Sequence, residues 1–136
     1  MLQHAAGSKF TICLWEEENG ACPTLEYLTA LEYGGKRERE DWARLEFLIK
    51  KFSDHGAPTK KESGHSLGDG IYELKAPNGG RIAWFYLPGQ IVLCTHGFHK
   101  PAGSYRAQID HAKKVREQAR AQTSDSPAAP APRQRK

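Results

Sequence analysis

The spacing of the hydrophobic residues changes near the middle of the chain. In residues 8–15 they alternate with polar residues, which predicts a half-buried first strand. A short helix is expected in residues 24–32, with Thr24 as the residue that caps its N-terminus. A longer helix is predicted in residues 37–55, because apolar residues three and four positions apart form one stripe and Gly56 follows as a stop. That stripe consists of Trp42, Leu45, Leu48, Ile49 and Phe52.

The second half of the chain has the dense hydrophobic pattern of β-strands. A polar loop that contains several glycines leads into three strands, expected in residues 70–76, 81–87 and 90–98. The turn sequences PNGG and LPGQ separate them and are typical of links between antiparallel neighbours. After Pro101, an amphipathic pattern predicts a closing helix in residues 105–122.

The turn after Leu87 decides which side chains share a face of the predicted sheet. If Leu87 lies opposite Gln90 in a two-residue turn, Arg81 lies opposite His96. One face then holds Arg81, His96, Phe98 and Lys100. Helices are expected to pack on the other face, which holds Ile82, Trp84, Tyr86, Ile91, Leu93 and Thr95.

The turn at Asn78 and Gly79 leaves two arrangements open. A strict two-residue loop places Leu74 on the Arg81 face. A loop longer by one residue, or a bulge, places Glu73 and Lys75 there instead. We favour the second arrangement because it collects the charged residues on one face.

The length of the chain indicates how many domains it has, and its charge indicates what kind of partner it contacts. The 136 residues suit one domain, expected over residues 1–122, followed by a disordered basic tail rich in proline and alanine at 123–136. The net charge of +4 conceals a difference along the chain, because the first 34 residues carry one lysine and five glutamates. The remainder therefore carries +8 and is the part expected to contact a polyanion.

The sequence argues against a membrane protein and against a protein stabilised by disulfides. It has no apolar segment long enough to span a membrane and no signal-peptide pattern at its start, so we expect a soluble, cytoplasmic protein. Cys13, Cys22 and Cys94 are odd in number and never spaced as CxxC. This favours reduced thiols over disulfides or a zinc site.

The candidate functional residues lie near the end of the strand predicted in residues 90–98. The sequence has no paired acids suited to metal-dependent hydrolysis and no glycine-rich phosphate loop. Cations and imidazoles suit the cleavage of RNA, because the 2′-hydroxyl of RNA is itself the nucleophile. The expected roles are phosphate binding by Arg81 and Lys100, proton transfer by His96 or His99, and base stacking by Phe98 or Tyr105.

Several of these residues also have a purely structural interpretation when each is taken alone. Arg81 fits a hairpin cap that pairs with Glu73, and His96 fits a hydrogen-bonded histidine within a sheet. His96 and His99 point to opposite faces of a strand and no third ligand accompanies them, so neither a metal nor a cofactor is expected. His65 is interpreted as a surface residue of a loop.

A short pattern runs from the strand in residues 70–76 to the closing helix. It consists of Glu73, Leu74, Lys75, Arg81, His96, Gly97, Phe98, Lys100, Ile109 and Ala112. This combination resembles the RelE/HigB superfamily of bacterial toxins, especially its phage-derived branch. The resemblance implies a compact α+β fold of the RelE type, with the order β-α-α-β-β-β-α and an antiparallel sheet packed against helices.

The resemblance also implies an activity and its partners. It implies the toxin of a type II toxin-antitoxin system, a metal-independent mRNA endoribonuclease that depends on the ribosome and inhibits translation. Its partners would be a cognate antitoxin, mRNA and the ribosome, with operator DNA contacted through the antitoxin and no membrane involved. The alternative is a noncatalytic binding protein, either a gyrase-directed toxin or a degenerate toxin that represses its operon together with its antitoxin.

The implied site follows from the matching positions. The catalytic residues would be Arg81, His96, Lys100 and His99. The RNA-binding residues would be Lys75, Glu73, Phe98, Tyr105 and Arg106. The sequence departs from the branch where Lys75 replaces the usual arginine and where Pro101 follows Lys100 in place of a second lysine. Lysine lacks the two-pronged phosphate contact of arginine, so these departures predict either weaker catalysis or a compensating contribution from His99.

Overall fold

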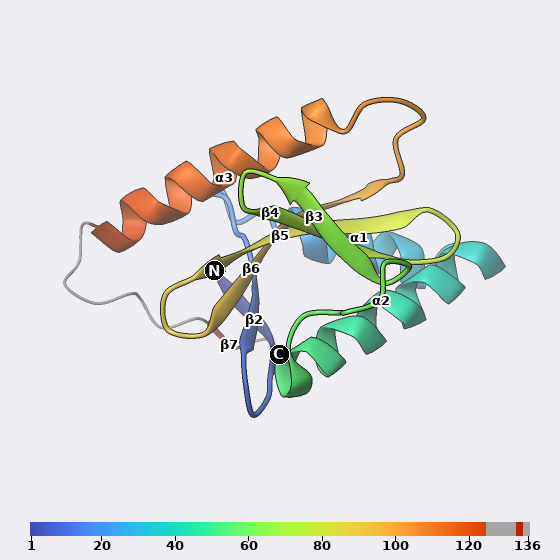
Figure 1. Cartoon of the computed structure of the whole chain (residues 1–136), viewed down its shortest axis with the longest axis horizontal. Helices are drawn as coiled ribbons and strands as arrows, with labels where there is room; N and C mark the ends of the chain where they lie inside the picture. Colours follow the sequence, from blue (N-terminus) through green and yellow to red (C-terminus); the bar gives the residue numbers. More distant parts are fainter. Residues whose placement is uncertain (125–132, 135–136) are drawn as a thin grey trace.

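A mixed β-sheet runs through the protein and has helices on both faces (Figure 1). The computed structural model describes residues 1–124 and 133–134. The elements are β1 (Leu2–Ala6), β2 (Thr11–Leu14), α1 (Pro23–Glu32), α2 (Lys36–His55), β3 (Gly64–Gly68), β4 (Ile71–Lys75), β5 (Gly80–Leu87), β6 (Ile91–His99), α3 (Arg106–Ser124) and β7 (Arg133–Gln134). The strand order is β3-β4-β5-β6-β2-β1-β7. The predicted α+β fold class is confirmed, and the expected tail at 123–136 lies mostly outside the described residues.

The three predicted strands of the second half form the antiparallel centre of the sheet as β4, β5 and β6. The sheet is not antiparallel throughout, because β2 pairs with β6 in parallel. Two further strands differ from the expectation. β1 precedes the predicted first strand and pairs with β2, and β3 forms within the predicted polar loop and pairs with β4. β3 (GHSLG) is polar and has glycine at both ends, so its composition gives little sign of a strand.

Both predicted helices of the first half are present, although one begins differently. α1 starts at Pro23 with Cys22 as its N-cap residue, so the prediction of Thr24 as the cap is wrong. Proline suits the first helical position, and the Cys22 backbone N–H donates instead to the Glu26 carboxylate at 2.8 Å. Thr24 lies buried inside the first turn. α2 ends at Gly56, as predicted, in a left-handed backbone conformation with φ of +94°.

Two hydrophobic cores lie on opposite faces of the sheet. The first contains the buried part of the predicted α2 stripe, with Trp42 packed at its margin, and joins α1 and α2 to Ile82, Trp84, Val92 and Cys94. The second joins α3 to the other face through Ala112, Val115 and Ala119, which meet Ala83, Phe85 and Leu93. α3 therefore covers the face of the sheet opposite to α1 and α2 (Figure 1).

The hairpin of β5 and β6 corrects the predicted register. Leu87 pairs with Ile91 across a three-residue turn, and Arg81 pairs with Phe98, so the prediction that Arg81 lies opposite His96 is wrong. The register shifts once more between Trp84 and Ala83, where Thr95 is the extra residue of a bulge. The longer turn places Ile91 and Leu93 on the α3 side, against the prediction.

The bulge restores the predicted grouping of the charged face. Ala83 pairs with His96 and Arg81 with Phe98, so Arg81, His96 and Phe98 still share one face. In the neighbouring strand, Glu73 pairs with Ala83 and Lys75 with Arg81. The favoured arrangement of the Asn78 turn, which puts Glu73 and Lys75 on the Arg81 face, is confirmed.

Candidate functional site

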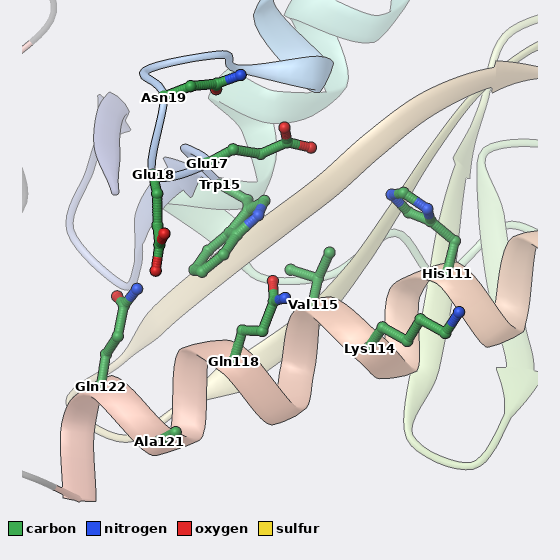
Figure 2. A pocket seen from close by; sticks show the side chains of 10 residues that line it. All are labelled: Trp15, Glu17, Glu18, Asn19, His111, Lys114, Val115, Gln118, Ala121 and Gln122. Atoms are coloured by element: carbon green, nitrogen blue, oxygen red, sulfur yellow. The ribbon is translucent and has the colours of Figure 1, made fainter.

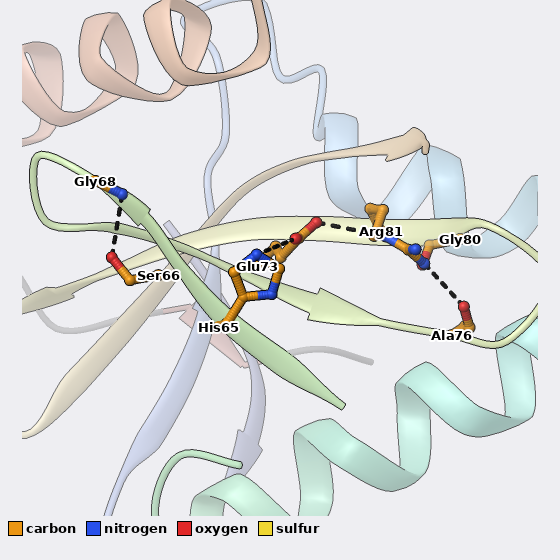
Figure 3. Close-up of polar contacts among 7 residues, drawn as sticks. All are labelled: His65, Ser66, Gly68, Glu73, Ala76, Gly80 and Arg81. Carbon is orange, nitrogen blue, oxygen red and sulfur yellow. Dashed lines mark hydrogen bonds and ion pairs between the residues drawn. The ribbon is translucent and has the colours of Figure 1, made fainter. Parts of the chain in front are cut away.

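A buried ion cluster joins three neighbouring strands on the α3 face of the sheet (Figure 3). Glu73 is 0% exposed, and its carboxylate lies 3.4 Å from Arg81 Nε and 3.3 Å from His65 Nε2. Arg81 is 5% exposed and donates from Nη1 to the carbonyls of Ala76 at 2.8 Å and Gly80 at 2.9 Å. Arg81 therefore holds the turn between β4 and β5 in addition to its pairing with Glu73.

His65 is the member of this cluster that reaches solvent. It lies on the edge strand β3 directly opposite Glu73, and its side chain is 40% exposed. The sequence interpretation set His65 aside as a loop residue because β3 was not expected. His65 is identified by its cross-strand pairing with Glu73, which can be recognised only when residues 64–68 are known to form β3. A buried carboxylate behind a half-exposed imidazole fixes the orientation of the ring.

His96 is a buried link between β6 and α3. Its Nε2 lies 2.8 Å from Gln108 Oε1, and its Nδ1 lies 2.8 Å from the Thr95 hydroxyl. Burial lowers the pKa of His96 to about 4, the hydrogen bond to Gln108 raises it, and nearby His111 lowers it further. The ring is thus neutral at pH 7, donating from Nε2 to Gln108 and accepting at Nδ1 from Thr95.

The predicted stacking residues pack against each other beside His96. The rings of His96 and Phe98 are stacked with centroids 5.2 Å apart, and Tyr105 meets Phe98 edge-on at 6.0 Å. Phe98 is buried, whereas Tyr105 is half-buried at the start of α3. Arg106 is exposed and lies 3.9 Å from Asp110 through its Nε atom. Lys75 is half-buried on the same face as Glu73.

His99 is separated from these residues by the alternation of β6. It lines a pocket of about 410 Å³ on the α1 and α2 side, together with Tyr27 and Asp41. Both Asp41 oxygens accept backbone N–H groups of the β4–β5 turn, from Asn78 at 2.9 Å and Gly80 at 2.8 Å. The next residue, Lys100, is exposed and is tied to the same turn, because its backbone N–H donates to the Gly79 carbonyl at 2.7 Å.

A larger open pocket of about 740 Å³ lies between the segment after β2 and α3 (Figure 2). Its lining includes Glu17 and Glu18 on one side and His111 and Lys114 on the other. None of the site residues predicted from the sequence lines it. The acidic residues balance the lysine, so this pocket is poorly suited to a polyanion.

The three cysteines are buried thiols. Burial raises the pKa of the Cys13 thiol to about 11 and raises that of Cys94 as well. Thiols in this state are not nucleophiles at neutral pH. Within residues 1–124 and 133–134, no three His, Cys, Asp or Glu side chains are grouped so as to hold a metal ion.

A family of known proteins matches more than half of the chain. The family described as phage derived protein Gp49-like (DUF891) matches residues 36–117, from the start of α2 into α3. No curated protein matches the chain. None of the helices in the described part of the chain has the length and apolar character needed to cross a membrane.

Proposed function

The chain belongs to the phage-derived Gp49-like family, a RelE/HigB-like toxin family, and from this premise we propose that it is a toxin that cleaves mRNA. The observation that carries the proposal is the arrangement around Glu73. A half-exposed imidazole from His65 lies against a buried carboxylate, and Lys75 lies on the same face of the sheet. This combines a proton-transfer group with a cation for phosphate, without any need for a metal.

In the proposed reaction the RNA supplies the nucleophile. The 2′-oxygen attacks the adjacent phosphorus and loses its proton to His65, while the bond from phosphorus to the 5′-oxygen breaks and that oxygen takes up a proton. The products are a 2′,3′-cyclic phosphate and a 5′-hydroxyl end. Lys75, Lys100 and Arg106 would neutralise the phosphate oxygens.

Arg81 and His96 have a positioning role in this proposal. Their burial and their hydrogen bonds within the protein support that role, because Arg81 holds the β4–β5 turn and His96 links β6 to α3. A direct catalytic role for Arg81 or His96 stays a prediction, as do those of Lys100 and His99. Tyr105, which is half-buried, is better placed than buried Phe98 to stack on a base.

The proposed partners follow from the family. A toxin-like protein of this kind is expected to bind a cognate antitoxin, and we propose that mRNA on the ribosome is its substrate and that operator DNA is contacted through the antitoxin. The burial of Arg81 and His96 favours one alternative, a noncatalytic toxin-like protein that binds gyrase or acts with its antitoxin in repression.

Mapping of mRNA ends tests the proposed activity. The wild-type chain, His65→Gln and the double variant Lys75→Ala, Lys100→Ala would be induced in bacteria, and new 5′ ends would be mapped at single-nucleotide resolution. Lys36→Ala is the matched control, because Lys36 is an exposed lysine at the far end of α2. New ends in translated messages are expected for wild type and control, with a loss of about 100-fold or more for His65→Gln. Growth arrest without new ends would exclude cleavage and favour the noncatalytic alternative.

A further inference from the structure

An aromatic side chain between two cations lies on the outer side of α2. Phe47 is 53% exposed, although most large hydrophobic residues of the described chain are buried. The Arg44 guanidinium lies 5.3 Å from the centre of the Phe47 ring and the Lys51 ammonium lies 6.0 Å from it. Such contacts hold the cations over the ring face.

This side chain borders a groove of about 410 Å³ between α2 and the segment that leads to β3. We call it the Phe47 groove, lined by Arg44, Phe47, Leu48, Lys51, His55, Gly56, Ala57, Pro58, Thr59, Lys60 and Ser63. The lining contains two lysines, one arginine and one histidine, and no acidic residue. Its charge therefore complements an anion, unlike the mixed pocket beside α3.

The groove is continuous with the edge of the sheet that holds the candidate site. Arg44 donates to the Ser63 hydroxyl at 3.2 Å, and the Ser63 carbonyl accepts the backbone N–H of Lys75 at 2.9 Å. His65 follows Ser63 by two residues and lies on the edge strand β3, which begins at Gly64. His65 and Lys75 lie on the α3 face of the sheet and the groove lies beside α2 on the other face, so a chain that leaves the site reaches the groove around the edge strand β3.

We propose that the Phe47 groove binds single-stranded RNA that flanks the cleavage position. In this proposal the Arg44 and Lys51 side chains turn from the Phe47 ring to the phosphates, which frees the ring for one base, and Lys60 meets a further phosphate. Protein sites that bind single-stranded nucleic acid combine an exposed aromatic ring, on which a base stacks, with cations that contact the phosphates. An acidic peptide would pair with the cations but would gain less than RNA from contact with the exposed ring. The inference rests on the proposed function for the nature of the ligand.

Binding to a noncleavable strand tests the inference apart from catalysis. The probe is a fluorescein-labelled 12-nucleotide 2′-O-methyl RNA, and its anisotropy is followed with the purified full chain at several salt concentrations. Phe47→Ala is expected to weaken binding about fivefold or more, which is the usual contribution of one stacked base. Lys51→Glu is expected to weaken binding and to flatten the dependence of affinity on salt.

Lys36→Glu is the matched control, because it makes the same charge change on the same helix outside the groove. Circular dichroism would establish that each variant is folded. Equal affinities for Phe47→Ala, Lys51→Glu and Lys36→Glu would overturn the inference. Unchanged RNA affinity together with a loss of antitoxin binding would also overturn it, in favour of a protein partner. If His65→Gln leaves the mRNA ends unchanged from wild type while the groove variants still lose affinity, the assigned role of His65 fails and the groove stands.

Discussion

Replacement of Arg81 by methionine is expected to destabilise the fold by about 3 to 5 kcal/mol. Glu73 has no exposed surface, so its carboxylate would keep its burial and lose the partner 3.4 Å away. The Ala76 and Gly80 carbonyls would lose the donors that Arg81 provides at 2.8 and 2.9 Å. The Glu73 carboxylate would keep only half-exposed His65 as a partner, and a buried charge that has lost its buried partner costs more than the broken contact itself contributes.

The double variant Glu73→Leu, Arg81→Met removes both charges and keeps similar volumes. It is expected to be more stable than either single variant, because no uncompensated charge stays buried. The difference between the double variant and the sum of the single variants measures the coupling of the pair, expected at about 2 kcal/mol or more.

Urea unfolding at pH 7, followed by tryptophan fluorescence, gives the free energy of unfolding of all four proteins. The slope with urea must stay constant for the comparison to hold. A loss below about 1 kcal/mol for Arg81→Met would refute the reasoning, since surface ion pairs contribute that little. Additive losses in the double variant would refute the coupling.

Three further predictions concern the contacts around the site. Because the folded state favours neutral His96, with a pKa of about 4 against an ordinary 6.5, the stability from this residue is complete above pH 6.5 and is lost as pH falls towards 4. That loss is expected to be about 2 to 3 kcal/mol, and urea midpoints between pH 7.5 and 4.5 should show a shallower slope for His96→Gln; equal slopes would contradict it. Gly97→Ala should destabilise the protein by about 1 to 3 kcal/mol, because the added carbon would collide with the Tyr27 ring, and an unchanged thermal midpoint would show that the two are not packed this closely. Asp41→Ala should cost about 2 to 4 kcal/mol by removing the acceptors for Asn78 and Gly80, and faster amide hydrogen exchange at both residues would locate the loss.

Two shifts of one residue each separate the observed register of β5 and β6 from the predicted one. The turn after Leu87 has three residues instead of the assumed two, and Gln90 adopts a left-handed backbone with φ of +59° that is uncommon for glutamine. The bulge at Thr95 is a second shift of one residue. The two shifts add, and two residues restore the original face. The grouping of Arg81, His96 and Phe98 on one face was therefore predicted correctly, while Ile91 and Leu93 were assigned to the wrong core.

Long periodic segments were predictable because their burial is strong and regular. The stripe of α2, its end at Gly56 and the three central strands appear as expected. β1 and β3 were not predictable from local pattern, because each is stabilised by pairing with its neighbours in the sheet more than by its own composition. The His65 contact was missed for the same reason. The burial of Arg81 and His96 depends on α3 and the turns, which alternation along one strand does not reveal.

The parallel pairing of β2 with β6 sets the order in which this molecule can be assembled during synthesis. β2 leaves the ribosome early, yet its partner for Thr11–Leu14 is the segment Ile91–Cys94, made much later. Contacts this distant in sequence form slowly, so the early segments wait for the late ones. The second core and the His96–Gln108 link require α3, which is made later still. A chain that lacks α3 thus lacks the assembled site, and any activity built on it begins only after α3 has been translated.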